Sequence, residues 1–154
     1  MGLDMYLSKK TYVQNWSITR PEKRHSITVK CGGVDVPHIK PERVSYIVEQ
    51  IYSWRKSNQI HKWFVDNVQG GVDDCEEHFV SRVRLKELLQ DCNMAIENRE
   101  SASDILPTAE GFFFGSTEYD EFYFQDIKET AEMLEKLLEE EPKNECDFYY
   151  QSSW

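Results

Sequence analysis

Residues 3–8 alternate between apolar and polar side chains as Leu-Asp-Met-Tyr-Leu-Ser. A period of two is typical of a strand with one buried face, so the chain is expected to open as a β-strand. A short strand is predicted over residues 27–30, just before Gly32 and Gly33, and a terminal strand over the aromatic-rich residues 148–154. The polar segment 14–26 is predicted to be a loop.

Three helices are predicted between the terminal strands. Pro41 suits the first turn of a helix, and apolar residues from 44 to 51 follow it at helical spacing, which predicts a helix from residue 41 to about residue 68. An apolar stripe over residues 85–96 predicts the second helix. The third is predicted to begin near Thr117, spaced from Asp120 as in a capping box, and to end at Pro142.

The order of these elements predicts an α+β fold. The 154 residues are enough for one hydrophobic core, and residues 1–154 are expected to form a single domain. Strands at both ends favour a small, largely antiparallel sheet that includes the N- and C-terminal strands and packs with about three α-helices. Loops are expected at residues 70–71 and 98–108, and a short buried strand at residues 112–114.

The charge balance limits the classes of partner. A formal net charge of −10 excludes broad, direct binding to nucleic acid and to anionic membranes, because both require a positive field. The acids gather over residues 129–145, while the first quarter of the chain is basic. No leader or membrane-spanning run is evident, so we expect a cytoplasmic protein whose four cysteines are free thiols. The 13% of aromatic residues exceeds the needs of one small core and favours a homodimer face.

The first predicted helix changes character halfway along. Its apolar stripe continues into Trp54, Arg55, Asn58, His61 and Lys62, so its core side becomes polar. Asn58 and His61 are then either satisfied within the core or point into a polar cleft. In the second case, Trp54 or Trp63 offers a stacking surface, Asn58 reads a ligand edge, and Arg55, Lys56 and Lys62 provide positive charge.

The aromatic segment 110–124 is the second candidate. Ser116 and Thr117 lead into a predicted helix N-terminus, which can receive an anion. Asp120 and its acidic neighbours offset that helix dipole and weaken such a site. We therefore expect this turn to set Tyr119, Asp120 and Tyr123 against the polar face of residues 54–67, and the two segments to form one site.

Other chemistries have little support in the sequence. Residues 73–78 contain Asp, Glu, Cys and His, but no second Cys/His pair at usual spacing completes a zinc site. Phosphate-binding loops, dinucleotide fingerprints and nucleophile elbows are absent. We therefore expect no metal and no cofactor, and an enzyme is the less favoured class.

Three segments carry a resemblance: residues 1–7 (Met-Gly-Leu-Asp-Met-Tyr-Leu), the Trp-Arg-Lys-x-Asn-x-Ile-His-x-Trp-Phe-Val-x-Asn pattern of residues 54–67, and residues 111–121. With these, the chain resembles a family of small, largely uncharacterised proteins encoded by bacteriophages and prophages. Some relatives carry a phosphoglycerate kinase label, but that enzyme is a much larger two-domain protein and this chain has no nucleotide loop. The resemblance implies a phage accessory protein that acts in the bacterial host cytoplasm.

Three functions follow as hypotheses. The first is a non-enzymatic antagonist of host defence that binds a small polar, nucleotide-like ligand. The second is an acidic inhibitor that imitates DNA and occupies the groove of a basic host nuclease or CRISPR effector through residues 129–145. The third is a small nucleotide hydrolase or transferase in which His61 and Asp120 act together.

Overall fold

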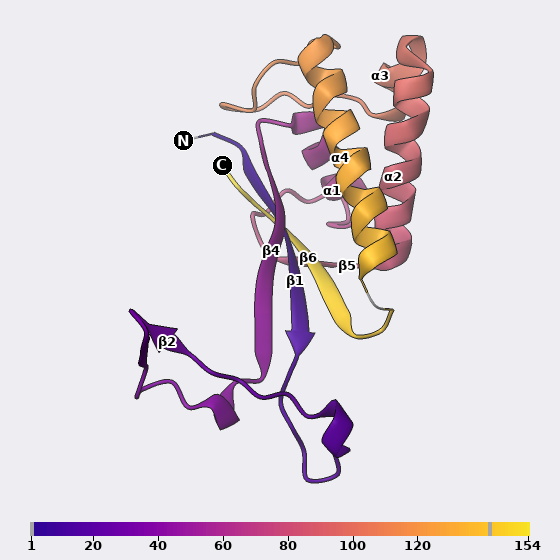
Figure 1. Cartoon of the computed structure of the whole chain (residues 1–154). Coiled ribbons are helices and arrows are strands. Elements are labelled where there is room, and N and C mark those ends of the chain that lie inside the picture. Colours follow the sequence, from indigo (N-terminus) through magenta and orange to yellow (C-terminus); the bar gives the residue numbers. More distant parts are fainter. Residues whose placement is uncertain (1, 142) are drawn as a thin grey trace.

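The computed structural model describes residues 2–141 and 143–154. Four strands form one antiparallel sheet in the order β4-β1-β6-β5 (Figure 1). Their bounds are β1 Asp4–Tyr12, β4 Tyr46–Arg55, β5 His78–Val80 and β6 Cys146–Ser153. Both terminal strands belong to this sheet, as the order of the elements predicted, and they lie side by side at its centre. Leu3, Met5 and Leu7 are fully buried on the inward face.

The helices pack on one face of this sheet (Figure 1). They are α1 Asn58–Asn67, α2 Arg82–Glu97, α3 Ala102–Ile105 and α4 Glu121–Glu140. The apolar stripes of α2 and α4 supply much of the core, and Phe64 of α1 stacks on Tyr150 of β6 with ring centroids 3.9 Å apart. The α+β class is confirmed; the described residues hold four α-helices rather than about three, because α3 is a single turn.

The predicted helix over residues 41–68 is wrong for most of its length. Residues 41–43 form a 3-10 turn, residues 46–55 are strand β4, and only residues 58–67 are helical. The apolar positions in this stretch fit both a helical period and a half-exposed strand. Pairing with β1 and a high content of β-branched and aromatic residues decide for the strand. Trp54, at the end of β4, is buried in the core.

Smaller boundaries also differ from the sequence predictions. The third helix begins at Glu121 rather than near Thr117, with Asp120 as its N-cap. Its last residue is Glu140, and Pro142 lies outside the described residues. Residues 112–114 form a turn, and Phe114 alone is buried there. The predicted strand at 27–30 is reduced to β2, Lys30–Cys31, which pairs with β3, Val34–Asp35.

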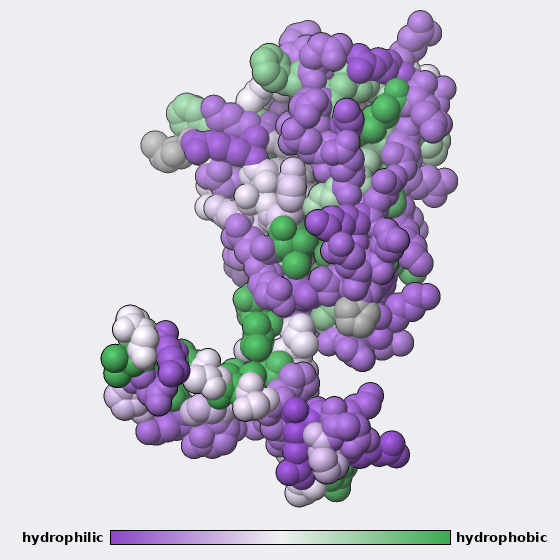
Figure 2. Space-filling view, viewed as in Figure 1, coloured by the Kyte–Doolittle hydropathy of each residue, from purple (hydrophilic) through white to green (hydrophobic). Residues whose placement is uncertain are grey.

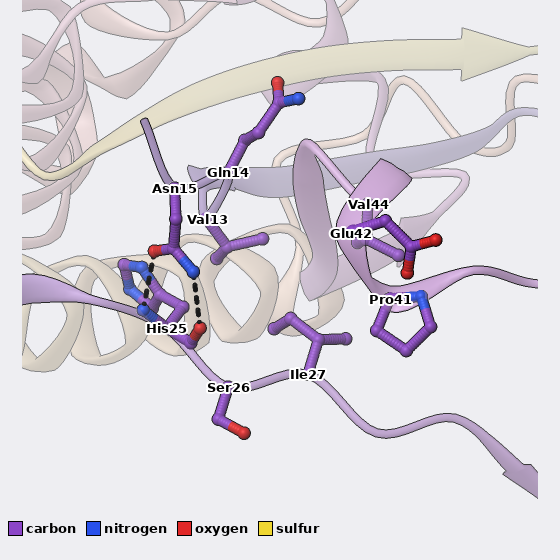
Figure 3. A pocket seen from close by; sticks show the side chains of 9 residues that line it. All are labelled: Val13, Gln14, Asn15, His25, Ser26, Ile27, Pro41, Glu42 and Val44. Carbon is purple, nitrogen blue, oxygen red and sulfur yellow. Dashed lines mark hydrogen bonds between the residues drawn. The ribbon is translucent and has the colours of Figure 1, made fainter. Parts of the chain in front are cut away.

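Residues 13–45, which we call the arm, connect β1 to β4 and project from the body on the β1–β4 ribbon (Figures 1 and 2). Val13 is the single buried residue of the arm. Within the arm, Asn15 connects the segment after β1 to the segment around His25. Its Nδ2 donates to the His25 carbonyl oxygen at 2.8 Å, and its Oδ1 accepts from the His25 backbone N–H at 2.9 Å. These residues border a hollow of about 350 Å³ together with Ile27 and Pro41 (Figure 3).

Buried acidic protons make the fold sensitive to alkaline pH. Burial raises the pKa of Tyr150 and Tyr123 above the ordinary 10.0, and that of Cys92 above 9.0. The unfolded chain therefore loses these protons first, so the contribution of these groups to stability is complete below about pH 9 and falls as pH rises further.

We expect the free energy of unfolding, measured by urea titration, to be lower at pH 10.5 than at pH 8. The decrease should be up to about 1.4 kcal/mol per pH unit above pH 9 for each group. Equal values would contradict this prediction, and Tyr123→Phe should reduce the slope.

Candidate functional site

A pocket of about 350 Å³ lies where β4 turns into α1 and faces the segment that enters α4. We call it the corner pocket. Its walls come mainly from the two segments that the sequence predicts to form one site, residues 54–67 and 110–124. It is lined by Arg55, Lys56, Gln59, Gly115, Ser116, Glu118, Asp120, Phe122, Tyr123 and Asp126.

Two unusual backbone positions bring the walls of the pocket together. Lys56 adopts φ = 57°, in the left-handed region that non-glycine residues seldom occupy, and this reverses the chain between β4 and α1. Gly115 has φ = 92°, and a Cβ there would lie 2.9 Å from Lys56 Cβ and 3.1 Å from its carbonyl oxygen. Only glycine satisfies both the dihedral angle and this close approach.

Gly115→Ala is therefore expected to lower the free energy of unfolding by about 2 kcal/mol, through backbone strain and contact with Lys56. Gly70→Ala is a matched control, because Gly70 also has positive φ (65°) but nothing lies within 4 Å of its added Cβ. Chemical denaturation of both variants isolates the contact. Equal losses in the two variants would show that Gly115 and Lys56 are not tightly packed.

Asn58 holds the 109–116 loop against α1. Its Nδ2 donates to the carbonyl oxygens of Phe114 and Ser116 at 3.1 and 2.9 Å, and its Oδ1 accepts from the Ala109 N–H at 3.0 Å. Buried polar groups require such partners. Asn58 thus lies in the core and orients the backbone of the pocket wall rather than reading a ligand itself.

The N-terminus of α4 is already occupied by protein groups. Asp120 Oδ1 accepts from the Tyr123 N–H at 3.0 Å, and Ser116 Oγ accepts from the Glu118 N–H at 3.1 Å. Tyr123 donates its hydroxyl to the Leu106 carbonyl oxygen at 2.7 Å, so its ring lines the pocket while its polar end is fixed. A free anion therefore gains little at this helix end, as the acids of its first turn predicted.

The charges of the corner pocket divide between its walls. Arg55 and Lys56 lie at the end of β4, whereas the carboxylates of Glu118, Asp120 and Asp126 lie before and within the start of α4. Arg55 is largely exposed and its Nε lies 3.8 Å from Asp4 Oδ1, a weak surface pair. A ligand with an anionic group at one end and hydrogen-bond donors at the other matches this arrangement.

The ionised form of Asp126 is disfavoured by its surroundings in the pocket. Burial raises its pKa; the nearby Ser57 and Gln59 side chains counter part of the rise, while Glu129 and Asp120 add to it. Burial is the dominant cause, and the Ser57 hydroxyl makes no hydrogen bond within the described residues. The Asp126 carboxylate therefore favours a ligand group that donates to it.

Asp126→Asn is expected to raise the melting temperature at pH 7. Because the folded-state pKa of Asp126 is raised, its ionisation costs stability as pH increases through that value, and asparagine carries no such cost. The gain should disappear below the ordinary aspartate pKa of 3.8. Thermal melts at both pH values test this, with Glu135→Gln as a control for one exposed charge on the same helix. A gain that persists at low pH would contradict the assignment.

His61 faces away from the corner pocket. Its Nδ1 lies 2.8 Å from the Tyr150 hydroxyl, and its Nε2 lies 2.8 Å from Asp73 Oδ2, while Trp154 donates to the other oxygen of Asp73 at 3.1 Å. The His61 ring is buried and packs edge-on against Phe114. Both ring nitrogens are thus engaged, and the His61–Asp120 pair that the enzyme hypothesis requires is not formed.

The remaining predicted site residues are distributed as follows. Arg55, Lys56, Ser116, Asp120 and Tyr123 line the corner pocket. The others do not. Trp54 and Trp63 are buried, and their ring N–H groups donate to Thr130 Oγ1 and Asp91 Oδ2, each at 2.8 Å. The Lys62 ammonium pairs with Asp66. Thr108 holds the other two residues: its hydroxyl donates to the Thr117 carbonyl oxygen, and its backbone N–H donates to the Tyr119 hydroxyl.

The corner pocket is also lined by residues that were not predicted as site residues, namely Gln59, Gly115, Glu118, Phe122 and Asp126. Asp126 follows Tyr123 by three residues on one helix, so helical spacing could have placed it on the same side. Helical spacing gives no such signal for Gln59 and Phe122, because the predicted helix over residues 41–68 includes β4 and the predicted third helix begins four residues before Glu121.

An acidic stripe runs along the outer face of α4. Glu129, Glu132, Glu135 and Glu139 are exposed at spacings of three and four residues, which places them on one side of the helix. The stripe lies close to β4: burial raises the pKa of Tyr52, and Glu129, Asp126 and Glu132 add to the rise. Its outer surface is therefore strongly negative beside the outer strand of the sheet.

Other parts of the described chain add little chemistry. All four cysteines are free. In residues 73–78, His78 pairs with Asp74 at 2.9 Å, and over residues 2–141 and 143–154 no cluster of three metal-ligating side chains is found. None of the described helices is long and apolar enough to cross a membrane.

Comparison with protein-family models, curated proteins and solved structures finds no match to this chain.

Proposed function

We propose that this chain is a non-enzymatic accessory protein of the phage type that binds a small polar, nucleotide-like ligand in the corner pocket and thereby antagonises host defence in the bacterial cytoplasm. The observation that carries this proposal is the convergence of Arg55 and Lys56 with Asp120, Asp126 and aromatic rings around one pocket. Its volume of about 350 Å³ suits a small molecule.

Each part of a nucleotide has a matching group in this pocket. Phosphate oxygens pair with the Arg55 guanidinium and the Lys56 ammonium, which are charge-assisted donors. Amino groups on a base edge donate to the carboxylates of Asp120 or Asp126, and the base stacks on the exposed ring of Phe122. The acids disfavour a purely anionic ligand, so inorganic phosphate alone should bind poorly.

Isothermal titration calorimetry against mononucleotides and linear and cyclic dinucleotides tests the proposal. Lys56→Gln and Arg55→Gln should each weaken binding at least about tenfold, as expected for loss of one charge-assisted contact. Lys62→Gln is the matched control, because the Lys62 ammonium lies 2.8 Å from Asp66 Oδ2 outside the pocket and its removal should leave affinity unchanged. Absence of binding tighter than about 1 mM across the panel would refute the proposal.

The acidic stripe supports a second candidate, an inhibitor that imitates DNA toward a basic host nuclease or CRISPR effector. Regularly spaced carboxylates along a straight helix are the observation in its favour. Reversing Glu129, Glu132 and Glu135 to lysine should abolish inhibition of such a target while leaving ligand binding in the corner pocket intact. Inhibition that survives the triple reversal would remove this candidate.

A further inference from the structure

The outer edge of β4 is open along a stretch of strong β-forming residues. β4 is an end strand of the sheet and pairs only with β1 among the described strands. Residues 46–50 read Tyr-Ile-Val-Glu-Gln, and Tyr46 and Val48 are 53% and 58% exposed. The register shifts opposite Leu7 and Ser8, so Ile51 is a bulge that ends this regular segment. Figure 2 shows exposed hydrophobic side chains where the ribbon leaves the body.

This segment lacks the usual protection of an edge strand. Soluble proteins blunt such edges with proline, lysine or an inward-pointing charge, and residues 46–50 contain neither proline nor lysine. The one charge, Glu49, is partly neutralised by Lys9, whose Nζ lies 3.2 Å away. Free backbone N–H and C=O groups beside exposed apolar side chains form a template for another strand.

We propose that a second copy of this chain occupies the edge, with residues 46–50 of two protomers pairing antiparallel about a two-fold axis near Val48. This dimer is independent of the ligand proposed for the corner pocket. A two-fold axis makes the contact self-complementary and closed. It also joins two four-stranded sheets into one continuous sheet in which both β4 edges are paired.

Charge complementarity identifies the partner as a second copy. The arm carries six lysines or arginines and three acids, whereas the rest of the chain carries 12 and 25. Antiparallel pairing places the arm of one protomer beside the Arg55 end of the other protomer's β4, near its acidic stripe and the entry to α4.

Both the arm and the segment that enters α4 also expose apolar side chains. The arm exposes Trp16 and Ile18, 60% and 91% accessible, and the other side exposes Phe112 and Phe122, 80% and 82% accessible. Such side chains at the centre of a contact, ringed by charge, are typical of protein interfaces.

Sedimentation velocity on the full chain between micromolar and submillimolar concentrations tests the dimer. We expect a species of twice the 18.2 kDa chain mass, whose dissociation constant rises at least about tenfold in Val48→Lys. Val83→Lys is the matched control, because Val83 is equally exposed but lies on α2. A wild-type chain that stays monomeric throughout, or a dimer untouched by Val48→Lys, would overturn the proposal.

Hydrogen exchange provides a readout that needs no variant. Amides of residues 46–50 should become more protected as protein concentration rises, while those of β5, the opposite edge strand, should not change. Added salt should weaken the dimer, because the attraction between arm and body is exposed to solvent. Exchange at residues 46–50 that does not depend on protein concentration would contradict the strand pairing. A dissociation constant that does not change with salt would contradict the charge attraction between arm and body.

Discussion

Replacing Asn58 with alanine is expected to lower the free energy of unfolding by about 3 kcal/mol. The side chain is buried and makes three hydrogen bonds to backbone groups of residues 109–116, as described above. Its removal leaves the Phe114 carbonyl and the Ala109 N–H without these partners, and each buried, unsatisfied group costs about 1–3 kcal/mol. Urea denaturation followed by tryptophan fluorescence measures the loss.

Two further variants separate this role from a general helix effect. Asn98→Ala removes a single exposed bond to the Met94 carbonyl at 3.1 Å and should cost less than about 1 kcal/mol. Asn58→Asp keeps the acceptor for Ala109 but sets a carboxylate against two carbonyl oxygens, so its cost should be largest at neutral pH and smaller in acid, where it can donate a proton. If Asn58→Ala were as mild as Asn98→Ala, the loop would be held by other contacts.

His61→Ala is expected to cost about 4 kcal/mol, in the range of large-to-small substitutions in cores. The substitution leaves a cavity under Phe114 and removes the link between Tyr150 and Asp73, which joins α1, β6 and the 73–78 loop. Tyr150→Phe removes only the hydroxyl and keeps the stack on Phe64, so it should cost about 1–2 kcal/mol. Thermal and urea unfolding of both variants provide the comparison.

The His61 variant also discriminates between structure and catalysis. If His61 stabilises the core, ligand binding at low temperature should persist in the fraction of His61→Ala protein that remains folded. A stable His61→Ala protein that loses a nucleotide-processing activity of the wild type would instead reinstate the enzyme hypothesis.

Strong periodicity explains which elements could be predicted from the sequence. β1 and α2 each carry one unambiguous period, β6 is rich in aromatic residues that favour strands, and the two terminal strands share one sheet as expected. Residues 44–51 fit two periods at once, and only the partner strand β1, far away in sequence, decides between them. Local pattern contains no information about that partner, so the error there is a tertiary effect.

The candidate site was predicted in part for a physical reason. Asn58 and His61 are polar residues on a side of α1 that must be buried. They therefore require hydrogen-bond partners whether they lie in the core or point into a polar cleft. Those partners are backbone groups in one case and Tyr150 and Asp73 in the other, neither of which sequence spacing identifies. The two predicted segments do meet. They are joined by the Lys56–Gly115 contact, by the Asn58 hydrogen bonds and by the ring contact of His61 with Phe114, but not by a His61–Asp120 pair.

The most direct test of the central claim is a ¹H–¹⁵N correlation spectrum of labelled protein during titration with the nucleotide panel. The corner pocket predicts saturable shift changes confined to amides of residues 55–59 and 115–126, and their loss in Lys56→Gln but not in Lys62→Gln. No shift change at about 5 mM ligand, or changes that map to the hollow of the arm instead, would contradict a ligand site at the corner pocket.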